Sequence, residues 1–414
     1  MPGPSAHEGR VFVQATGRRI QPFDDPLGET PIQNRPLAEW QARAFAEAGL
    51  TRIDEPSPPC LVVPDTLFAN GEALRAFVQG AAGRDAVLVL GRSLFGEATT
   101  PVQPQVTRVA EGWRFEAIRF VSGRQEQPVS VLVDPREWVA EFPAPQQYAG
   151  TTKLSLGVPR RMVMTLHHWV HVLWANQTAG GVELRSIPRW RLLGGLLWAM
   201  LRAMSFNRWK VLGKLNRIGR RCNIHPTALV EGSTLGDGVF VGPFARVAFS
   251  TIGDGAVVMP SASVELCVVG AQAIVADYCV VRSCVLYPGA AASQLLMQQC
   301  VLGRDAVTTK GGVTLDLNFD QEIKVPLDGR MHGTGLRFLG SAFGHRCRIG
   351  TGFYLSPGKA VPNDYFLIRD PRAICSVLPP GLAGGEPLVA SGRRLRPQAL
   401  LGLGRRAMNR GENR

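Results

Sequence analysis

The chain has 414 residues, of which 45% are hydrophobic and 19% charged, and its formal net charge is +13. This length supports two or three domains with sizeable cores, and the composition argues against a wholly disordered chain. No apolar run reaches the roughly 18 residues that span a bilayer, and the first residues lack a signal-peptide pattern, so we expect a cytoplasmic protein.

The N-terminal region, residues 1–150, alternates short apolar runs with one helical pattern. The runs predict buried strands, and the Ala and Leu spacing across residues 37–50 predicts an amphipathic helix. Strands interleaved with helices are typical of an α/β layer with a parallel sheet. An unrelated small α/β domain fits the same pattern.

Residues 151–216 form a connector that is rich in aromatic and basic side chains. Ten Lys and Arg residues and no Asp or Glu lie between residues 185 and 221. Trp and Arg residues flank the apolar stretch 192–201, which is the composition of a helix lying in a membrane interface against anionic lipid. A helical linker packed on a neighbouring domain or subunit is the alternative. No recognition motif for nucleic acid accompanies the charge, so we expect no nucleic-acid partner.

Histidines and cysteines raise the question of metal binding. His167 and His171 are four residues apart, so on one helix they could share a metal ion. No acidic residue accompanies them, which favours an aromatic helix docked at an interface. The eight cysteines contain no CxxC pair. We therefore predict no metal site and buried, reduced thiols.

A regular repeat begins at residue 218 and defines a region that we assign to residues 217–378. Aliphatic residues recur in steps of six, six and five, so that positions 218, 235, 252, 269 and 286 are each 17 apart. Such a period predicts a solenoid of short strands with three flat faces per coil, a parallel β-helix. A basic tail, residues 379–414, follows.

The repeat resembles the hexapeptide-repeat left-handed parallel β-helix proteins, most of which are acyltransferases and trimers. The resemblance implies the left-handed coil and a homotrimer. Residues 283–368 resemble, more closely, the acetyltransferase half of the archaeal-type bifunctional sugar-1-phosphate nucleotidylyltransferase/acetyltransferases. That family makes UDP-N-acetylglucosamine from glucosamine 1-phosphate, acetyl-CoA and UTP. Its loop, lysine-bearing strand and following segment match residues 312–320, Lys324 and residues 334–344 in order and spacing.

The same resemblance places the acetyltransferase site, and the chain departs from it. Gln294 stands at the catalytic histidine, Met297 at a tyrosine and Asp316 at the acceptor-binding asparagine, while Lys324 matches a lysine. The sugar amine must lose a proton as it attacks the thioester, and Gln294 cannot accept it. His332 or His345 could supply the base from a neighbouring loop.

The N-terminal region resembles the nucleotidyltransferase domain of the same enzymes. Residues 31–37 with the helix after them, and residues 61–68, match its blocks, with Asp65 at the metal-binding aspartate. The loop that binds nucleotide phosphates is shortened to residues 15–22, where Arg18 and Arg19 remain and only one glycine is kept. We interpret this as a truncated domain in which nucleotidyl transfer with Mg²⁺ is not expected.

Two functions remain open. The first is a divergent transferase that acts on a sugar phosphate or sugar nucleotide in envelope or polysaccharide synthesis, with acetyl-CoA or another acyl-CoA as donor. Acyl transfer, in a cleft between trimer subunits, is favoured over nucleotidyl transfer. The second is a non-catalytic relative that serves as a scaffold or regulator. In either case residues 185–221 could hold the protein on the inner face of the membrane.

Overall fold

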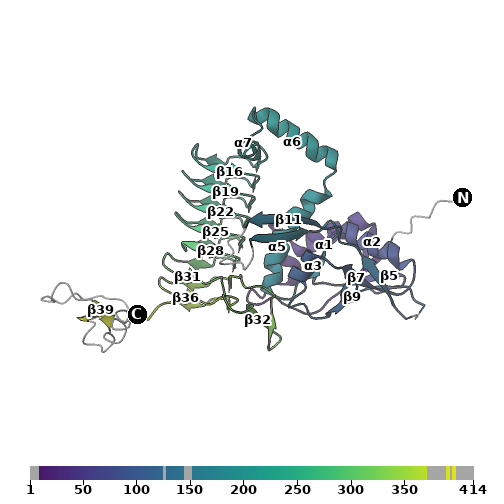
Figure 1. Ribbon diagram of the computed structural model, residues 1–414. Coiled ribbons are helices and arrows are strands. Elements are labelled where there is room, and N and C mark those ends of the chain that lie inside the picture. The colour runs from purple at the N-terminus through teal and green to yellow at the C-terminus, as the bar shows by residue number, and fades with distance from the viewer. Residues whose placement is uncertain (1–8, 125–126, 144–151, 371–387, 392–393, 398–414) are drawn as a thin grey trace, which may run out of the picture.

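The structure is a computed structural model that describes residues 9–124, 127–143, 152–370, 388–391 and 394–397. An α/β region stands beside a column of stacked coils, and three helices connect the two parts (Figure 1). Within the described residues, none of the helices combines the length and hydropathy needed to cross a bilayer.

The α/β region is built on a seven-stranded sheet of order β10-β7-β9-β5-β1-β4, with β8 paired to β9. Its strands are β1 (Gly9–Gln14), β4 (Leu50–Ile53), β5 (Cys60–Pro64), β7 (Ala86–Gly91), β8 (Val106–Val109), β9 (Gly112–Val121) and β10 (Val129–Val133). The prediction of a parallel sheet is wrong for β9, which runs antiparallel to both β5 and β7. Only two residues separate β8 from β9, and so short a turn joins antiparallel strands.

Helices cover this sheet, and the first one is the predicted amphipathic helix. It is α1 (Leu37–Ala48), which ends at Gly49 with a left-handed φ of 73°. The others are α2 (Gly71–Ala81), α3 (Leu94–Thr99) and the short 3-10 turn η1 (Leu27–Glu29). Three two-stranded sheets complete the region: β2 (Pro31–Ile32) with β3 (Arg35–Pro36), β6 (Leu67–Ala69) with β13 (Val163–Thr165), and β11 (Trp138–Pro143) with β12 (Lys153–Val158).

The coils form a parallel β-helix, as the repeat predicts, and the stacked parallel sheets are consistent with the left-handed coil that the resemblance implies. One eight-stranded sheet contains β14 (Arg217–Ile218), β17 (Thr234–Leu235), β20 (Thr251–Ile252), β23 (Val268–Val269), β26 (Val285–Leu286), β29 (Val301–Leu302), β34 (Ala342–Phe343) and β37 (Ala360–Val361). The second contains β15 (Asn223–Ile224), β18 (Phe240–Val241), β21 (Val257–Val258), β24 (Ile274–Val275), β27 (Ala291–Ala292), β30 (Val307–Thr308), β35 (Arg348–Ile349) and β38 (Phe366–Leu367). The third, of five strands, contains β16 (Leu229–Glu231), β19 (Arg246–Ala248), β22 (Ser263–Glu265), β25 (Val280–Arg282) and β28 (Leu296–Gln298).

Each coil places its aliphatic residue directly above that of the coil before it. Leu235 pairs with Ile252, and Ile252 with Val269, which is the predicted period of 17 residues. These side chains are buried inside the column. Removing apolar surface from water stabilises a fold by about 25 cal/mol per Å². These side chains leave water only when the coils stack on one another, so the repeated sequence produces a cooperative column.

One corner of the column carries a ladder of hydroxyl and thiol groups, formed by Ser233, Ser250, Cys267, Cys284 and Cys300. Each side chain accepts the backbone N–H of the next member, at 3.1 Å from the serines and 3.4 Å from the thiols. Each also donates to a carbonyl two residues before it. Burial raises the pKa of the Cys284 thiol. The cysteines of the described residues are free, as predicted, and all but Cys222 are buried, whereas Cys375 lies outside the described residues.

Within the described part of the coils, residues 217–370, the chain makes one excursion, which begins after β31 (Val313–Thr314) and ends at Gly340. The excursion contains the antiparallel hairpin β32 (Lys324–Leu327) and β33 (Arg330–Gly333). After it, β31 pairs with β36 (Tyr354–Leu355), and the last described strands, β39 (Leu388–Ser391) and β40 (Arg394–Pro397), form a separate hairpin.

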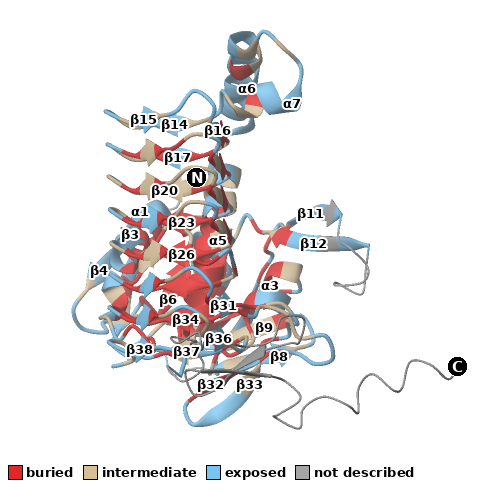
Figure 2. Ribbon diagram, turned by 90° about the vertical axis from the view of Figure 1, so that its left-hand side faces the viewer, coloured by how far each residue is buried: buried red, intermediate tan, exposed pale blue. Residues whose placement is uncertain are grey.

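Helix α5 (Trp169–Ser186) joins the two parts of the molecule and is buried along much of its length (Figure 2). Its apolar residues share one core with the α/β region and with the outer face of the coils, including Val285 and Val301. Polar contacts add to this junction, because Asn34 donates to the carbonyl of Val269 at 2.9 Å and Gln177 donates to that of Ser283 at 3.0 Å. The expectation of an aromatic helix at an interface therefore describes α5.

Candidate functional site

Two of the positions that the resemblance assigns to an acetyltransferase site lie inside the column. Gln294 is 1% exposed, and its Oε1 accepts a hydrogen bond from the Thr314 hydroxyl at 2.9 Å. Met297 is fully buried in β28, directly above Val281 of the preceding coil. A side chain at either position points into the coil, so neither residue can touch an acceptor on the outer surface.

Asp316 stands where the chain leaves the coils. It is half-buried, and burial raises the pKa of its carboxyl. Its backbone carbonyl accepts the N–H of Leu339, which ties the start of the excursion to its end. Asp316 therefore closes the excursion through its backbone, and its side chain lies at the base of that loop.

Lys324 and His332 lie on the same hairpin but on opposite faces of it. In the register, Lys324 faces Gly333 and Val325 faces His332. Cross-strand partners share a face and neighbours along a strand alternate, so His332 lies on the side of buried Val325 while Lys324 is exposed on the other. His332 interacts electrostatically with His168. The structure thus does not bring this base candidate beside the lysine.

His345 is 4% exposed, and both of its ring nitrogens are engaged. Its Nδ1 accepts the backbone N–H of Arg304 at 2.7 Å, which places the proton on Nε2. That Nε2–H donates to Oδ2 of Asp25 at 3.0 Å, and Arg304 donates to the other oxygen of Asp25 at 2.7 Å. The ring of His345 therefore has no free lone pair with which to accept a proton from a substrate. Its bond to Asp25 instead clamps the α/β region to the coils.

The carboxylate of this clamp was not anticipated from the sequence. Burial raises the pKa of Asp25, but the hydrogen bonds from His345 and Arg304 outweigh burial, so the pKa lies below its ordinary value. Phe23 stacks on Tyr287 beside the same histidine, with ring centroids 4.9 Å apart. Asp25 and His345 are 320 residues apart, and no local motif marks their pairing.

The nucleotide-site positions Arg18, Arg19 and Asp65 are held by contacts within the chain. Asp65 accepts hydrogen bonds from the backbone and hydroxyl of Thr16, at 3.1 and 2.7 Å. Arg19 donates to the carbonyl of Asp24 at 2.6 Å. Arg18 makes a two-bond ion pair with Asp328, at 3.0 and 3.2 Å. Asp328 sits in the turn of the β32–β33 hairpin. A carboxylate of the chain is therefore bound to the arginine that the resemblance assigns to nucleotide binding.

The donor set around Asp65 does not fit a resident Mg²⁺. Both of its oxygens are taken by Thr16, and among the described residues there is no group of three His, Cys, Asp or Glu side chains that could hold a metal ion. Mg²⁺ prefers several oxygen ligands in octahedral geometry.

Three adjacent histidines form a buried polar cluster at the start of α5. His168 caps the helix, and His171 accepts the backbone N–H groups of His167 and His168 at 3.1 and 3.0 Å. The Nε2–H of His171 donates to the carbonyl of Pro101. His167 precedes the helix, so it and His171 do not share a helical face. Burial lowers the pKa of His167 and His168 to about 3 and that of His171 to about 4.

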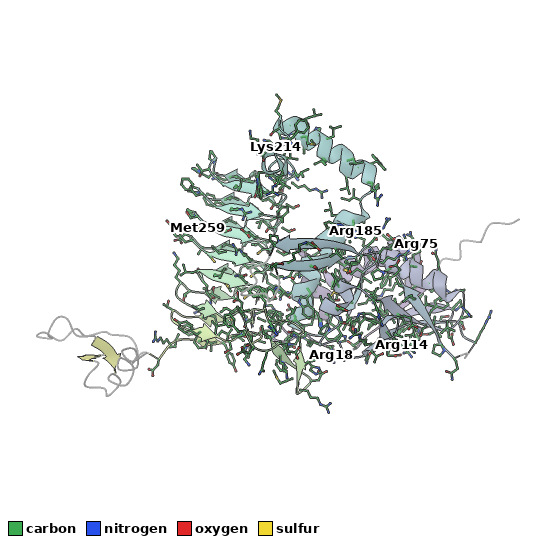
Figure 3. All side chains as sticks on the ribbon, viewed as in Figure 1. Arg18, Arg75, Arg114, Arg185, Lys214 and Met259 are labelled. Atoms are coloured by element: carbon green, nitrogen blue, oxygen red, sulfur yellow. The ribbon has the colours of Figure 1, made fainter. Side chains whose placement is uncertain are left out.

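An open polar groove lies elsewhere, against α2, and it is lined by none of the predicted site residues. Glu72 lines it and lies 2.8 Å from Arg160, 3.4 Å from Arg161 and 3.8 Å from Arg136. Arg75 also lines it, and Figure 3 shows Arg75 on the opposite side of the α/β region from Arg18. No pattern in the sequence marks this groove, because Arg75 and the pair Arg160 and Arg161 come from distant parts of the chain.

Comparisons with known proteins add little to this geometry. No model of a protein family and no curated protein matches the sequence. Among solved structures, the chain is similar to a Bacillus cereus protein provisionally named an acetyltransferase, at 14% identity and a TM-score of 0.12. The match covers 34% of this chain and 75% of that one. A likeness this low does not identify the fold. The sheet topology described above identifies it.

Proposed function

We propose that this chain is a non-catalytic scaffold built on the architecture of a hexapeptide-repeat transferase. One observation carries the proposal: the residues at both degenerate sites are engaged within the chain. Gln294 bonds to Thr314, Asp65 to Thr16, Arg18 to Asp328, and His345 to Asp25 and Arg304. A transferase needs such groups free to meet a substrate, whereas a scaffold uses them to hold its parts together.

The clamp between the two parts supports this role. Asp25, Arg304 and His345 fix the α/β region against the coils, and the α5 core does the same over a larger area. Enzymes that bind substrate between domains usually leave relative motion at that junction. We infer a rigid platform in which the coil faces that the α/β region does not cover are available for assembly, with a homotrimer as the expected arrangement.

A second candidate, CoA-dependent acyl transfer to a sugar phosphate or sugar nucleotide, keeps one observation in its favour. His332 is only half-buried, and its ring forms no hydrogen bond with the part of the chain that the structure describes. It could act as the base if an acceptor entered beside the hairpin. His332→Ala and the shape-matched His332→Gln would both abolish such an activity.

The test is a thermal-shift and calorimetric titration of the full chain with acetyl-CoA, CoA, UTP and UDP-N-acetylglucosamine. A ligand that binds only the folded state, at 100 times its Kd, stabilises it by about 2.7 kcal/mol and raises Tm. The scaffold proposal expects no shift with any of the four and no acetyl transfer to glucosamine 1-phosphate. A shift with acetyl-CoA together with transfer that His332→Ala removes would overturn it.

A further inference from the structure

We propose that helix α6 (Arg189–Ala203) and the segment after it, residues 204–209, dock on an anionic lipid bilayer, with the helix parallel to the membrane plane. This inference goes beyond the scaffold proposal and does not depend on whether the body of the protein catalyses a reaction. It commits to lipid as the partner because of the apolar stripe, the charge and the position of this helix.

The apolar stripe of α6 is exposed along its whole length. Trp190, Leu193, Leu197 and Leu201 follow each other at spacings of three and four, so they share one face of the helix, and they are 68%, 66%, 60% and 66% exposed. Ala199 is the helix's buried residue. Contiguous apolar surface of this kind marks an interaction site, because water contact with leucine and tryptophan side chains is unfavourable.

The stripe continues past the end of the helix. Met204, which ends α6 in a left-handed conformation, is 92% exposed, and Phe206 is 91% exposed. Trp209, in α7 (Arg208–Leu212), is 48% exposed. Together these residues extend the apolar surface into the turn, which would also enter the interface.

Cations accompany the aromatic residues in a regular way. Arg191 lies over the Trp190 ring at 5.0 Å, Arg202 over Trp198 at 4.5 Å, and Arg208 over Trp209 at 4.5 Å. Tryptophan rings settle at headgroup depth, where a stacked guanidinium meets lipid phosphates. Each cation near an anionic surface strengthens binding by about fivefold.

Charge also decides between lipid and the other occupants. Residues 185–221 carry ten basic and no acidic residues, so a second copy of this helix would bring like charge against like charge. Anionic lipid neutralises that charge and receives the leucine stripe at the same time. A nucleic acid would meet the charge but would leave the leucines in water.

The helix is placed where a bilayer could reach it. Figures 1 and 2 show α6 at one end of the molecule, clear of the α/β sheet and of the coil faces, with most of its residues exposed. Lys214 lies at this same end and Arg18 lies at the opposite one (Figure 3). The segment after α7 is fixed to the first coil, because the Asn216 amide donates to the carbonyl of Val230 at 2.7 Å and Gly232 donates to that of Leu212 at 3.2 Å.

The test is co-sedimentation of the full chain with vesicles of phosphatidylcholine alone and of phosphatidylcholine mixed with phosphatidylglycerol, at low and high salt. The variant Leu197→Asp puts a charge into the exposed stripe without touching the core. Its matched control is Leu132→Asp, since Leu132 is 55% exposed on β10 of the α/β sheet. Circular dichroism melting curves verify that both variants fold.

We expect binding to the mixed vesicles that exceeds binding to phosphatidylcholine by about tenfold and that salt weakens. Leu197→Asp should lower the bound fraction by about tenfold, while Leu132→Asp leaves it unchanged. No binding to the mixed vesicles, or equal binding by Leu197→Asp and the wild type, would overturn the proposal. A sedimentation-velocity mass that falls in Leu197→Asp without any vesicle binding would overturn it too, in favour of a second copy.

Discussion

Acidification should destabilise this protein strongly, because its three clustered histidines are buried in the neutral form. His167, His168 and His171 are 8%, 4% and 0% exposed, and burial lowers the pKa of each well below 6.5, to about 3, 3 and 4. Between about pH 6.5 and the folded pKa values, these histidines therefore bind more protons in the unfolded chain than in the folded chain. The contribution of the neutral histidines to the free energy of unfolding is fully present above about pH 6.5. It is lost as the pH falls toward the folded pKa values.

The magnitude follows from the same pKa values. Between pH 7.5 and 5.5, an unfolded histidine of ordinary pKa takes up most of one proton, whereas the folded one takes up almost none. That difference is worth about 1.4 kcal/mol per histidine, or about 4 kcal/mol for the three. Folded proteins are stable by only about 5–15 kcal/mol, so this loss is a large share of the total.

Urea denaturation at the two pH values, followed by circular dichroism, measures the effect. The variant His168→Gln removes one titrating group and should reduce the pH-dependent loss by about a third. The control Val172→Ala, at a buried position of the same helix, should lower the free energy of unfolding equally at both pH values. If His168→Gln loses as much stability on acidification as the wild type, the histidines are not the cause.

The remaining predictions concern the coils. A Cβ at Gly340 would overlap the Gln298 carbonyl and the Cys300 thiol, so Gly340→Ala should lower the free energy of unfolding by about 1–3 kcal/mol and lower Tm. The control Gly194→Ala, where a Cβ would lie in open space on α6, should not lower Tm. Cys284→Ser keeps both hydrogen bonds of its rung, whereas Cys284→Val breaks them, so chemical denaturation should find the valine variant less stable by about 1–3 kcal/mol. Equal stability of the two variants would contradict a role for the ladder.

The coils could be predicted from the sequence because the side-chain pattern that produces them is local and recurs in every coil. Every coil needs a small or aliphatic side chain at the same inward position, so Leu235, Ile252 and Val269 display the period directly. The antiparallel strand β9 could not be predicted from apolar runs, since a run carries no direction. Its direction depends on the short turn after β8.

The candidate site was predicted less well, for a reason that is also physical. The resemblance places Gln294 and Met297 at site positions, but it does not say which way those side chains point, and here the coil turns both inward. The clamp between Asp25 and His345 depends on how two distant parts of the chain dock. Contacts of that kind leave no period or spacing in the sequence.

The hydroxyl and thiol ladder makes the corner of the column modular. Because each rung bonds within its own coil and to the coils directly before and after it, the effect of losing one rung should fade within a coil or two rather than spread through the molecule. A whole coil could be duplicated or deleted with the rung pattern intact. The step from Cys284 to Cys300 is 16 residues, against 17 from Cys267 to Cys284, so the column also accommodates a coil that is one residue shorter while the thiol stays at the corner. Amide hydrogen exchange across Cys267, Cys284 and Cys300 would then read out, rung by rung, how the column opens.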